Sequence, residues 1–153
     1  MKVKLNEQPV MTVYRRILNK DKLVYLLVGP KPIRLPGLHG GRSRIAYVGT
    51  TRKGKHRIAA SAAYRAEEIF EKRGLRKLDV HVVTCRSTQG LTSWQYLEKA
   101  ILAVFHERYG RIPVCNQKGD SYRWNQKLEK LFGHQRILNI VMQFDAKEGQ
   151  LTS

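Results

Sequence analysis

Acidic residues, cysteines and long apolar runs are all scarce in this sequence. Its 153 residues include only 12 Asp and Glu and two cysteines, Cys85 and Cys115, which form no CxxC pair. No apolar run approaches the roughly 20 residues of a membrane span, and the first residues lack the apolar segment of a signal peptide. These absences argue against a membrane-spanning protein and against a disulfide scaffold. They favour a reduced, cytoplasmic protein whose cysteines are small buried hydrophobes rather than zinc ligands.

Positive charge is abundant and clustered. The 29 Lys and Arg give a formal net charge of +17, and the stretch from Lys22 to Ala66 contains ten of them and no acid. Such a surplus indicates a polyanionic partner, because basic side chains that neutralise phosphates release condensed counterions. Nucleic acid is favoured over a membrane surface, since no long helix with a one-sided basic face is evident. Charge that only maintains solubility is the alternative. Candidate nucleic-acid contacts are Lys31, Arg34, Arg42, Arg44, Arg52, Lys53, Lys55 and Arg57.

The patterning predicts a single domain over residues 1–153 that belongs to the α+β class. Short apolar or β-branched runs predict strands at residues 23–28, 44–49 and 78–85. Helices are predicted at residues 56–72, 92–109 and 124–132. Residues 137–144 are a candidate final strand, and residues 10–18 fit either a strand or a helix. The order favours a small central antiparallel sheet, of about three strands, flanked by helices.

Two segments carry additional local signals. Residues 30–41 hold three prolines and three glycines and are therefore predicted to form a loop. In the helix predicted at 92–109, Thr92 and Gln95 have the spacing of a capping box, and Gly110 is expected to end the helix. The predicted buried stripe of this helix consists of Leu97, Ile101, Val104 and the stem of Arg108.

Two tyrosines lie in triplets within the first two predicted strands. These triplets are Leu23-Val24-Tyr25 and Tyr47-Val48-Gly49, and alone they would indicate two half-buried core tyrosines. Further along, Arg57 follows Tyr47 by ten residues, Glu98 lies in a predicted helix, and Pro113-Val-Cys-Asn116 comes after that helix. In this order and spacing the chain resembles the GIY-YIG endonuclease family over about residues 23–119.

The resemblance implies a GIY-YIG-like core at about 23–119, an N-terminal extension at 1–22 and a C-terminal addition at 120–153. It further implies a one-metal endonuclease that hydrolyses DNA phosphodiester bonds, with Glu98 as the ligand of Mg²⁺ or Mn²⁺. A carboxylate is the hard oxygen donor that these ions prefer. Arg57 would hold the scissile phosphate with paired donors. Asn116 would support the site from behind.

The resemblance leaves the roles of the two tyrosines open. Tyr25 is favoured as the general base, with Tyr47 assisting. Because a free tyrosine has a pKa of about 10, a nearby cation would be needed for that role near neutral pH. Many family members have His or Tyr four residues after the arginine, whereas this chain has Ser61. Tyr64, or alternatively His56, could replace that second acid or base. The first triplet also departs from the family, with Leu23 in place of Gly.

The segment at residues 30–43 is expected to contact phosphate near the cut, because it joins the two strands that carry the tyrosines and contains Lys31, Arg34, His39 and Arg42. A disordered insertion is equally compatible with its composition. The expected partner is DNA, without a nucleotide cofactor or a membrane, and the protein is expected to be a monomer or homodimer. Restriction, homing and repair roles stay open. The alternative function is a non-catalytic or RNA-directed basic protein on the same fold, in which Glu98 is an ordinary surface glutamate and Asn116 caps a turn.

Overall fold

A computed structural model describes residues 22–35, 41–52, 54–86, 92–117 and 122–145. Over these residues the protein is an α+β fold with a three-stranded antiparallel sheet and four helices. The elements are β1 (Leu23–Arg34), β2 (Arg42–Thr51), α1 (Gly54–Arg73), β3 (Asp79–Val83), α2 (Ser93–Tyr109), α3 (Gln126–Phe132) and α4 (His134–Met142). The α+β prediction is thus confirmed. The predicted element at residues 10–18 lies outside the described residues.

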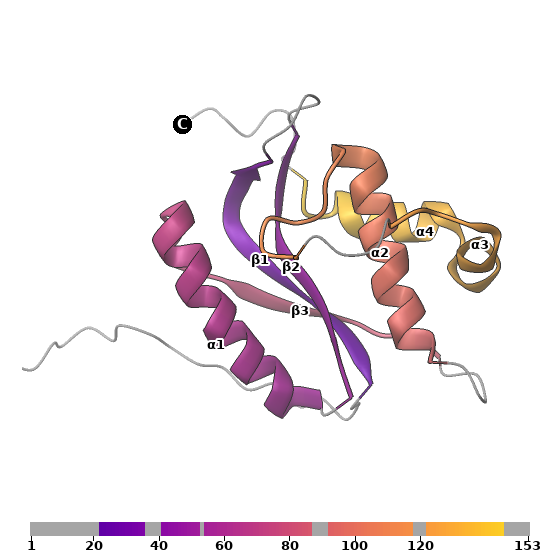
Figure 1. Cartoon of the computed structure of the whole chain (residues 1–153), viewed down its shortest axis with the longest axis horizontal. Helices are drawn as coiled ribbons and strands as arrows, with labels where there is room; N and C mark the ends of the chain where they lie inside the picture. Colours follow the sequence, from indigo (N-terminus) through magenta and orange to yellow (C-terminus); the bar gives the residue numbers. More distant parts are fainter. Residues whose placement is uncertain (1–21, 36–40, 53, 87–91, 118–121, 146–153) are drawn as a thin grey trace, which may run out of the picture.

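The sheet has helices on both faces (Figure 1). Its strand order is β2-β1-β3, so β1 is central and pairs antiparallel with both neighbours. Residues of β1 alternate between two cores: Tyr25 and Leu27 belong to the core beside α1, whereas Val24 and Leu26 belong to the core beside α2, α3 and α4. This explains why residues 23–28 are continuously apolar, since a strand covered on both faces has no polar side. None of the helices in the described part of the chain has the length and apolar character needed to cross a membrane.

The connection between β1 and β2 is shorter than predicted. The loop prediction for residues 30–41 is wrong for residues 30–34, because β1 continues to Arg34, which pairs with Arg42. The register between the strands shifts between Val28 and Ile33. Prolines 30 and 32 fall in this irregular stretch, where a residue without an N–H interrupts little regular pairing. His39, the predicted loop histidine, lies outside the described residues.

The C-terminal prediction of a strand at 137–144 is wrong, because this segment forms α4 up to Met142. The buried residues of α4 are Ile137 and Val141, which are one helical turn apart. A short apolar run fits a strand or a buried helix equally well, and here contact with α2 stabilises the helix. Gly133 lies between α3 and α4 with φ +72°, a conformation that allows the sharp change of direction between the two helices.

The prediction for helix α2 is confirmed at the C-terminal end of the helix and is wrong at its N-terminal cap. Gly110 adopts the left-handed conformation with φ 69° and ends the helix, as predicted. The capping-box prediction is wrong, since the Thr92 side chain makes no capping hydrogen bond. The stripe of Leu97, Ile101 and Val104 is buried. However, the stripe does not continue to Arg108, which is exposed and ion-paired with Asp145 at 2.6 Å. Cys115 is buried and Cys85 is packed against a core.

Candidate active site

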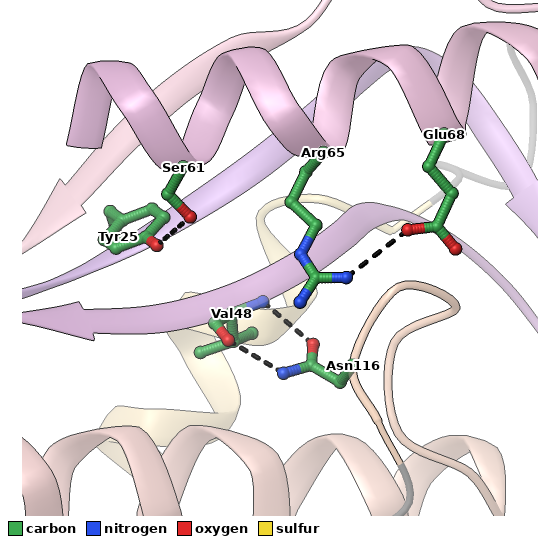
Figure 2. Close-up of polar contacts among 6 residues, drawn as sticks. All are labelled: Tyr25, Val48, Ser61, Arg65, Glu68 and Asn116. Atoms are coloured by element: carbon green, nitrogen blue, oxygen red, sulfur yellow. Dashed lines mark hydrogen bonds and ion pairs between the residues drawn. The ribbon is translucent and has the colours of Figure 1, made fainter. Parts of the chain in front are cut away.

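The outer edge of β2 is covered by the segment that follows α2. The side chain of Asn116 makes two hydrogen bonds with the backbone of Val48: its Oδ1 accepts from the amide at 3.0 Å, and its Nδ2 donates to the carbonyl at 2.8 Å (Figure 2). The amide of Cys115 donates to the carbonyl of Ala46 at 3.0 Å. These bonds satisfy backbone groups that an edge strand would otherwise leave unpaired. They also join the Pro113–Asn116 sequence element directly to the Tyr47–Gly49 triplet.

Both motif tyrosines lie on the α1 face of the sheet. Tyr25 is paired with Gly49 across the strands, and the ring centroids of Tyr25 and Tyr47 are 5.9 Å apart. A Cβ on Gly49 would lie 2.6 Å from Cε1 of Tyr47 and 2.8 Å from the hydroxyl oxygen of Tyr25. Only glycine therefore leaves room for both rings over β2. Tyr25 is buried, whereas Tyr47 is partly exposed and accessible to a ligand.

Ser61 has a clear structural partner. The hydroxyl group of Tyr25 donates a hydrogen bond to Oγ of Ser61 at 2.6 Å (Figure 2). Burial raises the pKa of Tyr25 to about 12, although the hydrogen bond between Tyr25 and Ser61 and, more weakly, the charge of Arg57 lower it. At neutral pH Tyr25 is consequently a neutral phenol. The nearby cation that its predicted role as a base requires is Arg57, but its effect is smaller than that of burial.

Arg57 and Tyr64 both lie on α1 and are exposed to solvent. Arg57 is close enough to Tyr25 for its charge to affect the pKa of that phenol, so these two predicted site residues are brought together. Tyr64 is 71% exposed and lines an open groove of about 470 Å³, which is bordered by Asn116 and Gln117. The side chain of His56, the other candidate for the second acid or base, is outside the described set.

Glu98 lies on α2, on the opposite face of the sheet from the tyrosines. Its carboxylate is hydrogen-bonded with Thr50, which points to the same face of β2 as Val48 because strand residues alternate. Burial raises the pKa of Glu98, while the bond with Thr50 and the charge of Lys99 lower it. Since β2 is an edge strand that ends at Thr51, groups on its two faces can meet around its outer edge or beyond this end. Tyr47 thus lies near Thr50, the partner of Glu98, along β2, but Tyr47 and Glu98 are on opposite faces of the sheet.

The candidate metal site offers one protein carboxylate, that of Glu98. Within the described ranges, no three His, Cys, Asp or Glu side chains come together as a metal-binding group. Glu98 is a half-buried carboxylate that keeps an exposed fraction. This fits Mg²⁺ or Mn²⁺, because such ions retain several waters and need only one or two carboxylates from the protein.

The predicted nucleic-acid contacts fall into two groups at opposite ends of the β1–β2 hairpin. Lys31, Arg34 and Arg42 are exposed at the end where Arg34 pairs with Arg42. Arg52 and Arg57 are exposed at the other end, where β2 leads into α1. The length of β2 separates them by about 30 Å at ~3.3 Å per residue. Arg44 is partly tied to the fold, since its Nε donates to the Gly29 carbonyl at 2.9 Å. Lys53 and the side chain of Lys55 are outside the described set.

One residue of this region is missed by the sequence patterns. Arg65 lies two helical turns after Arg57, and its guanidinium is 4.9 Å from the centre of the Tyr47 ring. The same guanidinium is paired with Glu68 at 3.3 Å. The available signal was the spacing of Arg57, Ser61 and Arg65 at four-residue intervals, which places all three on one side of α1.

Comparisons with protein-family models, with curated proteins and with solved structures each found no match to this chain.

Proposed function

We propose that this protein is a divalent-metal-dependent endonuclease that hydrolyses DNA phosphodiester bonds, with restriction-type cleavage as one possible role. The observation that carries the proposal is the convergence of separate sequence elements on residues 47–50 of β2. Asn116 binds Val48 through both of its amide atoms, Glu98 is hydrogen-bonded with Thr50, and Tyr25 lies opposite Gly49. These are elements that also carry the GIY-YIG resemblance.

In this proposal each side chain of the site has a separate role in the hydrolysis of the phosphodiester. Arg57 holds the non-bridging oxygens of the scissile phosphate with paired donors, which an exposed guanidinium at the start of α1 can do. Tyr47, which is partly exposed, orients the attacking water through its hydroxyl group. Tyr25 acts as a neutral hydrogen-bond donor rather than as the base, because its pKa is about 12. Asn116 fixes β2, and thereby Tyr47, from the outer edge. Tyr64 borders the adjoining groove and contacts the nucleic acid there.

Glu98 is the proposed metal ligand. When bound, Mg²⁺ or Mn²⁺ supplies stabilisation of the negative charge that develops on the phosphoryl oxygens. Glu98 contributes a carboxylate whose orientation is held by Thr50. The raised pKa of Glu98 has a direct consequence, since protons compete with the cation for this carboxylate. Cation binding, and with it cleavage, should therefore weaken on acidification at a higher pH than for an ordinary glutamate.

The test is a cleavage assay on supercoiled plasmid with Mg²⁺ or Mn²⁺ and an EDTA control. Glu98→Gln, which preserves size and can still accept from Thr50, should abolish metal-dependent nicking while DNA binding persists. Glu107→Gln is the matched control, because it removes the same charge from an exposed position of the same helix. Cleavage that survives in Glu98→Gln would refute the assigned metal ligand. A wild-type protein that cuts neither plasmid nor branched or single-stranded DNA would refute the nuclease.

A non-catalytic or RNA-directed nucleic-acid-binding protein is the second candidate. It is favoured by one observation, the location of Glu98 on the sheet face opposite the tyrosines. This candidate predicts binding that decreases steeply with salt, no effect of EDTA, and the same affinity for Glu98→Gln and the wild type.

A further inference from the structure

The Tyr47 ring is held in place by groups from three elements. Beneath it, Gly49 of β2 leaves the space that a side chain would occupy. Beside it, the Tyr25 ring from β1 is tilted by 45° at a centroid distance of 5.9 Å. Over it, from α1, lies the guanidinium of Arg65 at 4.9 Å from the ring centre. Of these groups, Arg65 is the only one that carries a charge.

Arg65 is itself well oriented. Figure 2 shows its side chain extending from α1 toward β2, with its guanidinium paired to Glu68 one turn further along the helix. The guanidinium is also 5.5 Å from the centre of the Tyr64 ring, so it is close to two aromatic rings. Only 19% of the Arg65 side chain is exposed. A planar cation in such a position stacks on an aromatic face more effectively than an ammonium group.

We propose that Arg65 is a positioning residue for Tyr47, which it holds over β2 so that the Tyr47 hydroxyl group faces the phosphodiester that is cut. This inference rests on the proposed nuclease function. In this role Arg65 does not bind the phosphate itself, because Glu68 already occupies part of its donor set and little of the side chain is exposed. Glu68 keeps the guanidinium turned toward the ring. The sequence resemblance assigns the arginine function to Arg57 alone, so Arg65 would be a second arginine with a different task.

The decisive variant is Arg65→Gln, which removes the cation and leaves a polar side chain of moderate length. The kcat for cleavage should fall roughly ten- to a hundredfold while KM stays within about twofold, because misplacing one reacting group by about 1 Å has effects of that size. Arg65→Lys should give an intermediate kcat, since it keeps the charge but loses the flat stacking surface. Arg73→Gln is the matched control: it removes the same charge from an exposed site at the end of the same helix and should leave kcat unchanged.

A second readout does not depend on cleavage. In protein labelled at its tyrosine rings, the NMR resonance of Tyr47, assigned with Tyr47→Phe, should shift in Arg65→Gln and stay in place in Arg73→Gln. Equal thermal melting of Arg65→Gln and Arg65→Lys would show that both variants fold.

Three outcomes would overturn the inference. They are an unmoved Tyr47 resonance, an unchanged kcat in Arg65→Gln, and a raised KM at constant kcat, which would make Arg65 a substrate-binding residue. If the wild type cleaves and one of these is found, the proposed function stands and only the role of Arg65 fails. If the wild type cleaves nothing, both fail together.

Discussion

At the scale of single residues, the site depends on small side chains that make room for large ones. Gly49 leaves space for two tyrosine rings, and Ser61 accepts the hydroxyl hydrogen of one of them. A histidine or tyrosine at position 61 would bring its own acid–base group into the site, whereas serine only orients Tyr25. Ser61 thus gives Tyr25 a hydrogen-bonded hydroxyl group, whereas burial is what keeps this phenol neutral.

The alkaline titration of Tyr25 should reveal this state. The ultraviolet absorbance of tyrosinate in the wild type minus that in Tyr25→Phe should titrate with a midpoint of about 12, because burial raises the pKa of Tyr25 from its ordinary 10.0. Tyr25 also makes the stability of the fold depend on pH. Its contribution to the free energy of unfolding is fully present below pH 10.0 and is lost as pH rises through about 12, because the unfolded chain, which has the ordinary pKa, ionises first. A midpoint near the ordinary value would instead make Tyr25 available as a base.

At the scale of elements, the segment from Pro113 to Asn116 covers the outer edge of β2. Its two contacts, from Cys115 to Ala46 and from Asn116 to Val48, act like a short additional strand. Edge strands with unpaired backbone groups are prone to pair with other chains. Here the covered part of the edge lies directly beside Tyr47, so structural protection and the candidate site share the same residues.

Replacing Asn116 should therefore affect stability and the candidate site together. Asn116→Ala leaves the amide and carbonyl of Val48 without their partner and should lower the free energy of unfolding by about 1–3 kcal/mol, measured by chemical denaturation. Hydrogen exchange should accelerate at the Val48 amide and not at the amides that bond within the β1–β3 pair. Asn139→Ala, at an exposed position of α4, is the matched control. Equal exchange at Val48 in wild type and Asn116→Ala would show that water replaces the amide without loss.

The elements also show what the sequence can and cannot predict. Helix α1, helix α2 and residues 23–28 of the central strand were predictable from a long periodic pattern or an apolar run, although Gly29-Pro30 does not end β1, which continues to Arg34. The α4 segment was not, since Ile137 and Val141 fit both helical and strand periods until α2 is present to pack against. Glu98 became a candidate through the GIY-YIG resemblance, and its role stays a prediction. Its location across the sheet from Tyr47 depends on which face of β1 receives α2, and no local pattern encodes this.

At the scale of the whole molecule, the candidate nucleic-acid contacts that the structure describes form two groups rather than one stripe. Exposed arginines lie at both ends of the β1–β2 hairpin, about 30 Å apart at ~3.3 Å per residue. A duplex that extends across the α1 side could contact both groups, with the scissile phosphate nearer to Arg57. The distance corresponds to about one turn of B-DNA, which is ~34 Å.

This arrangement predicts that both groups contribute similarly to DNA binding. The double variants Arg34→Gln/Arg42→Gln and Arg52→Gln/Arg57→Gln should each reduce the slope of log affinity against log salt by about 2, because each loses two phosphate contacts. Binding is measured by fluorescence anisotropy with a labelled duplex. The pair that includes Arg57 should also abolish cleavage, and the other pair should not. If only one pair changes the slope, DNA does not span the hairpin.

The bonds along the outer edge of β2 also have a consequence for the order of events during synthesis on the ribosome. Ser43 forms a bridge with Asp145, and the amide of Arg44 donates to the carbonyl of Phe144. These partners, like Asn116, emerge long after β2 itself. The nascent chain can pair β1 with β2 early, but it carries an open strand edge until its last helices have been made. Chains stalled on the ribosome when only the residues up to α2 have emerged should thus be prone to aggregation. Chains stalled when Asp145 has also emerged should not.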